Sequence, residues 1–219
     1  MKKLLLGLLP LVLFATPAVL RAQDSDGKAQ QLARDLWKAS GGENWGKVKA
    51  IRFTFVVEDN GNQLARAEHD WDVAAQTDHV KWKDKDITVS VASMPQDEAA
   101  KAAFGRWTND SYWLLAPLKV LDPGVKLSYG GSKEVDGANC ETLRVSFAAV
   151  GMTPGDQYNF YIDPATKLLK AWDYMPKPDT EMHGSWEKYQ EAGGLNLAME
   201  HNFGGKMIRF ENVEVKTAQ

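Results

Sequence analysis

The residues that could carry metal chemistry are four histidines, and their placement argues against a shared site. His69 lies near Trp71 on the apolar face of a predicted strand, where we expect a buried histidine with satisfied hydrogen bonds. His79 lies on the polar face of the next strand. Two side chains on opposite faces of one sheet cannot bind the same ion. His183 and His201 are isolated in the sequence, and no His-Glu-x-x-His spacing occurs. We therefore expect no metal and no cofactor.

The paired carboxylates and the single cysteine show no catalytic pattern. Asp70 and Asp72 share the polar face of a strand, and Asp97 and Glu98 stand at a predicted helix start, where acidic residues favour the helix dipole. A glycosidase needs two carboxyl groups facing each other in a cleft. Cys140 lies in a predicted strand without a marked base, and no G-x-S-x-G motif occurs. We predict that the protein is not an enzyme.

The eight tryptophans are the strongest compositional signal in the 219 residues. Indole rings fill apolar cores, and they also line apolar cavities that have a polar rim. Three interpretations follow: plain core residues, a cavity for an acyl chain or another apolar ligand, or sugar stacking on exposed rings. Trp71 and Trp82 fall on the apolar face of the predicted sheet, and Trp113 falls on a helical insert that would cover that face.

The first 22 residues predict a secretory signal peptide. Lys2 and Lys3 precede an apolar run from residue 4 to residue 14, and a plausible cleavage site lies at Leu20-Arg21-Ala22. The run is too short to span a membrane, and no cysteine follows it for lipidation. The location is therefore predicted as periplasmic or secreted, and residues 23–219 are predicted to form a single domain.

Charge excludes one class of partner. The predicted signal peptide holds three of the 26 basic residues and no acidic one, so the remaining chain has 23 basic against 29 acidic residues. A nucleic-acid-binding domain normally carries a basic surface. We therefore expect no nucleic-acid partner.

The elements that must position these residues are mostly strands. Residues 26–40 show the apolar spacing of a helix with Asp26 as N-cap, and glycines follow it. Alternating strands and turns fill the rest, including an Asn60-Gly61 hairpin turn and a strand at 182–190. A helical insert is expected near 95–116 in two pieces, the second capped by Asn109 or Asp110.

Faces and charges also favour a register for the second and third strands. Trp71 would lie opposite Val80 on the apolar side, and Asp70 would lie opposite Lys81 on the polar side. The predicted fold class is mainly β (α+β): a single strongly curved antiparallel sheet of about ten or eleven strands. An N-terminal helix and the helical insert would cover its concave face.

Two segments resemble a known superfamily. Residues 39–48, Ala-Ser-Gly-Gly-Glu-Asn-Trp-Gly-Lys-Val, and residues 158–169, with their Asp163-Pro164 turn, resemble exported bacterial proteins of the lipoprotein-carrier (LolA/LolB-like) superfamily. Residues 115–124 and 152–156 resemble a sub-family of unknown function within it. The resemblance implies a half-barrel whose concave side is plugged by helices over an apolar cavity. It also implies carriage of acyl chains or lipoproteins through the periplasm.

The leading hypothesis is a non-catalytic periplasmic protein that binds an acyl chain, a lipid or a lipidated peptide in this cavity. A lipoprotein or an envelope protein is a further partner, peripheral membrane contact is compatible with the hypothesis, and a monomer is expected. The alternative is a cell-envelope interaction module with a filled core that binds a protein partner through an edge strand or the 105–124 loop. A hydrolase using His69 or the strand carboxylates is a third hypothesis. The predicted ligand-lining residues are Phe53, Phe55, Trp71, Trp82, Trp107, Trp113, Leu115, Phe160 and Trp172.

Overall fold

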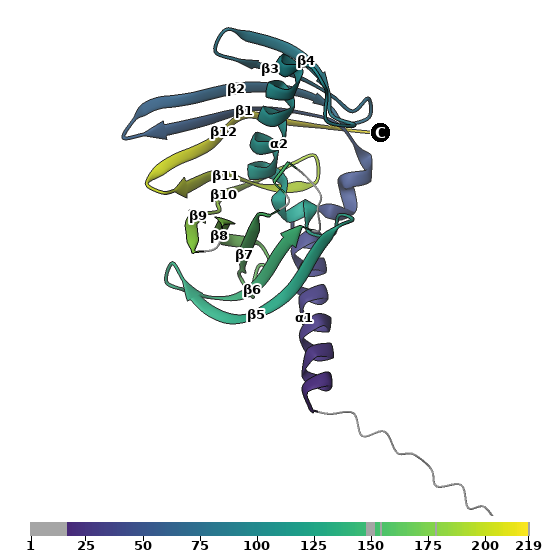
Figure 1. The fold of residues 1–219 in the computed structure, drawn as a ribbon, viewed down its shortest axis with the longest axis vertical. Helices are drawn as coiled ribbons and strands as arrows, with labels where there is room; N and C mark the ends of the chain where they lie inside the picture. The colour runs from purple at the N-terminus through teal and green to yellow at the C-terminus, as the bar shows by residue number, and fades with distance from the viewer. Residues whose placement is uncertain (1–16, 148–151, 154, 178, 219) are drawn as a thin grey trace, which may run out of the picture.

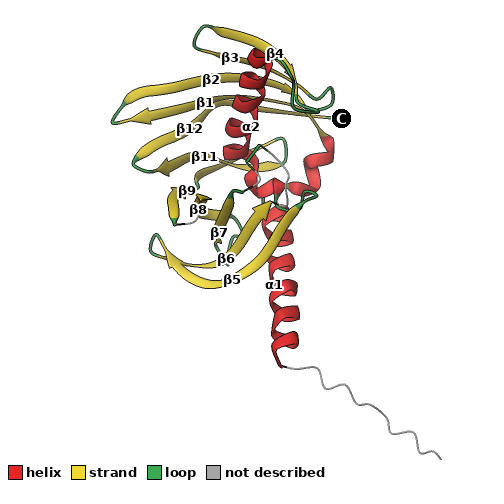
Figure 2. Ribbon diagram, in the orientation of Figure 1, coloured by secondary structure: helices red, strands yellow, loops and turns green. Residues whose placement is uncertain are grey.

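The fold is one open antiparallel sheet with helices against it. A computed structural model of the protein describes residues 17–147, 152, 153, 155–177 and 179–218. Within these residues, twelve strands form a single curved sheet, and α1, η1 and α2 accompany it (Figures 1 and 2). This confirms the predicted mainly β half-barrel with an N-terminal helix and a helical insert.

The helices are α1 (Pro17–Ala39), the 3-10 helix η1 (Gly42–Lys47) and α2 (Glu98–Lys119). The strands are β1 (Val48–Asp59), β2 (Asn62–Asp72), β3 (Thr77–Trp82), β4 (Lys85–Ser90), β5 (Val125–Val135), β6 (Ala138–Phe147), β7 (Gln157–Ile162), β8 (Leu169–Lys177), β9 (Thr180–Ser185), β10 (Glu187–Ala192), β11 (Leu195–Phe203) and β12 (Lys206–Thr217). Their order across the sheet is β4-β3-β2-β1-β12-β11-β9-β8-β7-β6-β5, and β10 pairs with β11 beside this path.

Several hairpins turn where the sequence predicts them. In the β1–β2 turn, both central residues have positive φ, 49° at Asn60 and 80° at Gly61. This geometry matches the twist of the flanking strands and is accessible mainly to Asn, Asp and Gly. Equivalent pairs close other hairpins at Asp136-Gly137, Gly193-Gly194 and Gly204-Gly205.

The second half of the sheet has one strand more than predicted. The expected strand at 182–190 is two strands, β9 and β10, separated by Trp186. Strand β9 pairs with β8 on one side and with β11 on the other, whereas β10 continues the pairing with β11 beyond the edge of β8. Trp186 is 3% exposed and packs edge-on against Trp172 in the core. The continuous β pattern of the sequence hides the point at which the pairing with β8 ends.

The helical insert is one helix rather than two pieces. Helix α2 runs without interruption through Gly105 and Asn109. Its N-cap is Asp97, whose side chain accepts a hydrogen bond from the Ala100 backbone N–H at 2.9 Å, so the helix begins where the sequence placed its acidic start. The expectation that Asn109 or Asp110 caps a second helix is wrong, and residues 105–119 are helical rather than a loop.

The register of β2 and β3 differs from the predicted one by two residues. Trp71 lies opposite Asp78, and His69 lies opposite Val80. A shift of two keeps every side chain on its predicted face, and Glu68 opposite Lys81 still pairs opposite charges. Faces and charges therefore could not distinguish the two registers. The observed turn is fixed by the Asp72 carboxylate, which accepts from the Ala75 N–H at 2.8 Å.

Helix α1 joins the sheet through the segment that resembles the carrier superfamily. A side chain at Gly41 would collide with the backbone of the β10–β11 turn, because its Cβ would lie 2.1 Å from the Gly194 carbonyl oxygen. Asn44 donates to that carbonyl at 3.0 Å, and Asn196 donates to the Ala39 carbonyl at 2.7 Å. The Gly-Gly and Asn residues of this motif thus serve close packing of backbone on backbone. Helix α1 begins at Pro17, earlier than the predicted cap at Asp26.

The core lies on the concave face of the sheet. The apolar stripe of α1 and the C-terminal half of α2 join strand residues such as Phe53, Phe160 and Trp172 in one large cluster. A smaller cluster at the other end of α2 contains Val80 and Ala103. Residue Tyr161 points to the convex face, where it packs against Cys140, which is buried as a small packed residue. Figure 1 shows α2 crossing the sheet.

Among the described helices, none has the combination of length and apolar character needed to cross a bilayer. Residues 1–16 of the predicted signal peptide lie outside the described residues.

Candidate functional site

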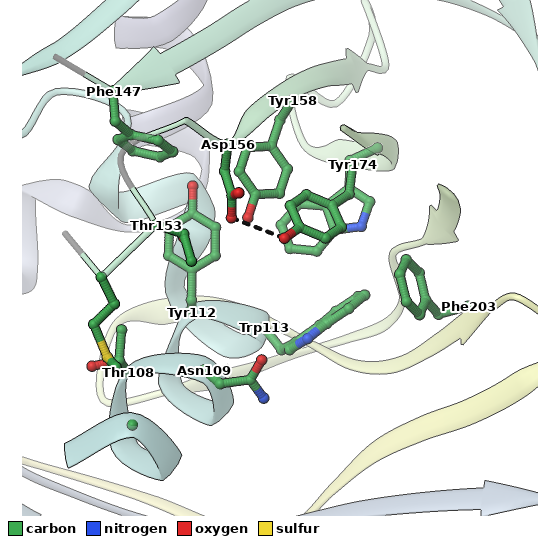
Figure 3. A pocket seen from close by; sticks show the side chains of 13 residues that line it. Thr108, Asn109, Tyr112, Trp113, Phe147, Thr153, Asp156, Tyr158, Tyr174 and Phe203 are labelled. Atoms are coloured by element: carbon green, nitrogen blue, oxygen red, sulfur yellow. Dashed lines mark hydrogen bonds between the residues drawn. The ribbon is translucent and has the colours of Figure 1, made fainter. Parts of the chain in front are cut away.

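The pocket that best fits a small ligand lies between α2 and the second half of the sheet. Its volume is about 370 Å³, within the range of small-molecule sites. Helix α2 supplies one wall, strands β7, β8 and β11 supply the other, and the end of β6 with the residues before β7 forms the rim (Figure 3). The lining residues are Gly105, Thr108, Asn109, Tyr112, Trp113, Phe147, Met152, Thr153, Asp156, Tyr158, Trp172, Tyr174 and Phe203.

Aromatic rings make up most of the pocket wall. Trp113 contacts Trp172 with ring centroids 4.5 Å apart and Phe203 with centroids 4.9 Å apart. Tyr112 stacks on Trp172 at 5.9 Å. Such mutually supported rings form a preformed apolar surface, because each ring is held by its neighbours. The geometry suits an apolar ligand that slides between α2 and the sheet.

A carboxylate stands at one end of this aromatic wall. Asp156 is 8% exposed, and its Oδ2 accepts a hydrogen bond from the Tyr174 hydroxyl at 2.9 Å (Figure 3). Burial, then this hydrogen bond and the charge of Asp156, raise the pKa of Tyr174 to about 12. Burial foremost also raises the pKa values of Tyr112 and Tyr158 far above their ordinary value of 10. All three phenols are therefore neutral at physiological pH.

Two of the nine sequence-predicted lining residues, Trp113 and Trp172, line this pocket. The other seven lie in the surrounding core. Phe53 and Phe55 on β1 both pack against Phe210, and Trp71 on β2 packs against Trp107 of α2. Leu115 and Phe160 belong to the large core cluster, and Trp82 lies beside the smaller one. All eight tryptophans are buried or half-buried.

A cluster of polar side chains around His69 lies under the face of α2 that points away from the pocket. Nδ1 of His69 lies 2.7 Å from Oδ2 of Asp78, and Nε2 lies 3.1 Å from Oδ2 of Asp110 on α2. Arg106 donates to the same oxygen of Asp110 at 2.5 Å. The side chains of His69, Asp78 and Asp110 are fully buried. We call these three residues, together with Arg106, the His69 network.

The His69 network is balanced as an ion cluster. Burial by itself lowers the pKa of His69, but the hydrogen bonds that His69 donates to Asp110 and Asp78 outweigh it and hold the pKa above 6.5. The imidazolium then donates from both nitrogens, and with Arg106 it balances two carboxylates. The sequence-based prediction of a buried, satisfied His69 is confirmed. The network fastens α2 to β2 and β3, and its members do not line the pocket.

The other histidines have separate environments. His201 sits among Trp113, Trp186 and Phe210, and burial lowers its pKa to about 3 despite a hydrogen bond to the Ser185 carbonyl. His183 binds Asp173 and Asp136. His79 pairs with Asp86. Within the described part of the chain, no group of three or more His, Cys, Asp or Glu side chains is arranged to hold a metal ion.

Three carboxylates of these two sites have no functional role in the sequence-based predictions. Asp110 is predicted there as a helix cap, and Asp78 alternates with Val80 and Trp82 on the apolar face of its strand. Asp156 is the last residue of the 152–156 segment and stands out by no other pattern. Asp78 carried a usable signal: a carboxylate that alternates with Val80 and Trp82 needs a buried partner. Asp156 carried none, because its burial depends on strands and a helix far apart in the sequence.

The curved sheet with helices on its concave face is a LolA-like fold, and solved structures support this. The LolA superfamily protein NE2245 from Nitrosomonas europaea matches with a TM-score of 0.53 and 5% sequence identity, over 85% of this chain and 94% of that one. A DUF1329 family protein from Desulfovibrio piger matches with a TM-score of 0.51 and 10% identity, over 89% of this chain and 95% of that one. No family model matches the sequence, and no curated protein matches it significantly. At these identities the likeness concerns the fold, and function must be argued from the site.

Proposed function

We propose that this protein binds an apolar ligand, such as an acyl chain, a lipid or a lipidated peptide, in the aromatic pocket between α2 and the sheet. The observation that carries the proposal is the pocket itself: about 370 Å³ with seven aromatic side chains in its wall. A core built only for stability would close such a space, because interiors pack to crystal-like density. The open aromatic surface supports a binding role.

The energetics of such binding need no catalytic group. Burying a methylene group contributes about 0.8 kcal/mol, so a chain of about ten would contribute roughly 8 kcal/mol before ordering costs. That magnitude is enough for reversible carriage. The protein therefore acts as a binding protein and not as an enzyme. The predicted signal peptide places this activity in the periplasm or outside the cell, where a carrier would shield an acyl chain from water.

The first test is native mass spectrometry of the protein purified from a periplasm, with lipid extraction alongside. We expect a co-purifying mass that matches an acyl lipid. Thr108→Trp adds bulk in the pocket and should weaken rebinding by about tenfold or more. Trp113→Phe should weaken it severalfold, because part of the aromatic wall is lost.

Trp71→Phe is the matched control. Trp71 was predicted to line the ligand site, but it lies against Trp107 and outside the pocket, so rebinding should be unchanged. A protein that carries no lipid and takes up neither fatty acid nor phospholipid on titration would overturn the proposal. It would favour an envelope interaction module instead. If Trp71→Phe and Trp113→Phe weakened lipid rebinding equally, the ligand would not bind in this pocket.

A further inference from the structure

The pocket has an electrostatic asymmetry that an apolar ligand alone does not explain. Among its thirteen lining residues, Asp156 is the only one with a formal charge. A carboxylate that is 8% exposed in an aromatic wall loses most of its hydration. Buried charges are normally paired or strongly hydrogen-bonded. The negative charge of Asp156 therefore requires a compensating group.

The protein itself supplies little compensation. Within the described residues, the one side-chain hydrogen bond of Asp156 comes from the neutral Tyr174 hydroxyl, and Asp156 forms no ion pair with Lys, Arg or His. The residues between Phe147 and Asp156 include no basic one. The contrast with Asp110 is informative, because that buried carboxylate meets both His69 and Arg106.

The surroundings of Asp156 match those of a cation site. Tyr158 stacks on Tyr174 with centroids 5.0 Å apart, and Tyr112 lies 5.6 Å from Tyr158. All three rings line the pocket together with Asp156. The face of an aromatic ring is electronegative and attracts organic cations, most strongly in a site shielded from water. A carboxylate beside such rings adds the opposite charge.

We propose that the ligand of this pocket is an amphiphile with a positively charged amine or quaternary ammonium group, held by Asp156 and the tyrosine rings while its apolar part packs along Trp113 and Trp172. This deepens, and rests on, the proposed apolar-ligand function. An anionic head group would face an unpaired carboxylate, so a free fatty acid is disfavoured in this orientation.

The test compares ligands that share one chain and differ in head group. Octyltrimethylammonium, 1-octanol and octyl sulfate are titrated into the full-length mature protein below their micelle concentrations, with isothermal calorimetry as readout. Tetramethylammonium is a fourth probe without a chain. We expect the cationic compound to bind at least about tenfold more tightly than the other two octyl compounds. Asp156→Asn should reduce that preference to about threefold or less and leave octanol binding unchanged.

A control variant keeps this result interpretable. Glu134→Gln removes one exposed carboxylate elsewhere on the chain, so it should retain the cation preference and control for net charge. If Glu134→Gln reduced the preference as fully as Asp156→Asn, the effect would follow net charge and not the pocket carboxylate, and the proposal would fail.

The outcomes separate this inference from the proposed function. Equal binding of the three octyl compounds, or a cation preference that survives Asp156→Asn, overturns the cation site and leaves the apolar pocket standing. Failure of every octyl compound to bind overturns the proposed function. In that case the titration with tetramethylammonium tests the cation site independently. Binding of tetramethylammonium that is lost in Asp156→Asn would support the cation site, and absence of binding would overturn it.

Discussion

The two opposite faces of α2 meet the sheet in different ways. One face, which includes Ala103, Arg106, Asp110 and Leu114, packs onto the sheet through apolar contacts and the His69 network. The other face, which includes Thr108, Asn109 and Tyr112, looks into the aromatic pocket. Residues three or four positions apart share a helix face, so the residues that pack on the sheet alternate along α2 with those that line the pocket.

The difference separates attachment from binding. Buried ion pairs fix the position of α2 against β2 and β3. The pocket face is then free to remain incompletely packed, because it does not have to hold the helix in place. The two carboxylates of this region illustrate the contrast: within the part of the chain that the structure describes, Asp110 has two basic partners, whereas the side chain of Asp156 has one neutral hydroxyl.

The largest expected effect comes from breaking the attachment face. Asp110→Ala leaves His69 and Arg106 without their shared carboxylate, and removing one partner of a buried ion cluster costs about 3–5 kcal/mol. Urea denaturation followed by circular dichroism would measure this loss. Asp86→Ala removes the carboxylate of an exposed His–Asp pair and should leave stability almost unchanged, because solvent screens such a pair. Similar losses in the two variants would contradict the role assigned to the His69 network.

An intermediate effect is expected from pH. Native His69 holds its proton to a higher pH than the unfolded chain does, so between these two pKa values the unfolded state binds fewer protons. The stabilisation from His69 is therefore complete below pH 6.5 and is lost as pH rises through the raised native pKa.

His183 contributes in the same direction, because its hydrogen bonds to Asp173 and Asp136 outweigh burial and raise its pKa. The pH series is therefore best run in a His183→Gln background. Free energies of unfolding between about pH 6 and about pH 9 should fall with pH in this background and change less when His69→Gln is added. If the free energy of unfolding fell with pH at the same rate with and without His69→Gln, the stability of the network would not depend on the imidazolium.

The smallest effect lies on the pocket face. Gly105 is an interior helix residue that lines the pocket, and a Cβ there would lie 3.6 Å from the Met152 methyl group, an ordinary contact. Gly105→Ala should raise stability by about 0.5–1 kcal/mol through helix propensity. It should also narrow the pocket and weaken binding of the octyl compounds slightly. Thermal unfolding and calorimetry would check the two effects, and a destabilised variant would contradict this reading of the pocket face.

Local patterns predicted much of the fold. The Asn60-Gly61 turn, the alternation around Trp71 and the apolar stripe of α1 each depend on a few neighbouring residues, and all three are confirmed. Features that depend on the choice between equivalent local options were missed. The β2–β3 register is one example, because two registers satisfied the same faces and charges. The division of the 182–190 segment at Trp186 is another, because β9 and β10 share the partner β11 and differ in that β9 also pairs with β8.

The sequence by itself therefore determined the type of most elements and the face of most side chains, because periodicity and turn chemistry act over a few residues. Only the tertiary structure decided which tryptophans border the pocket, which carboxylates are paired and how α2 is oriented. Trp113 and Trp71 look equivalent in the sequence, yet one lines the pocket and the other packs against Trp107. That distinction depends on how one helix is rotated over a curved sheet, and this rotation is set by contacts such as His69 with Asp110, 41 residues apart.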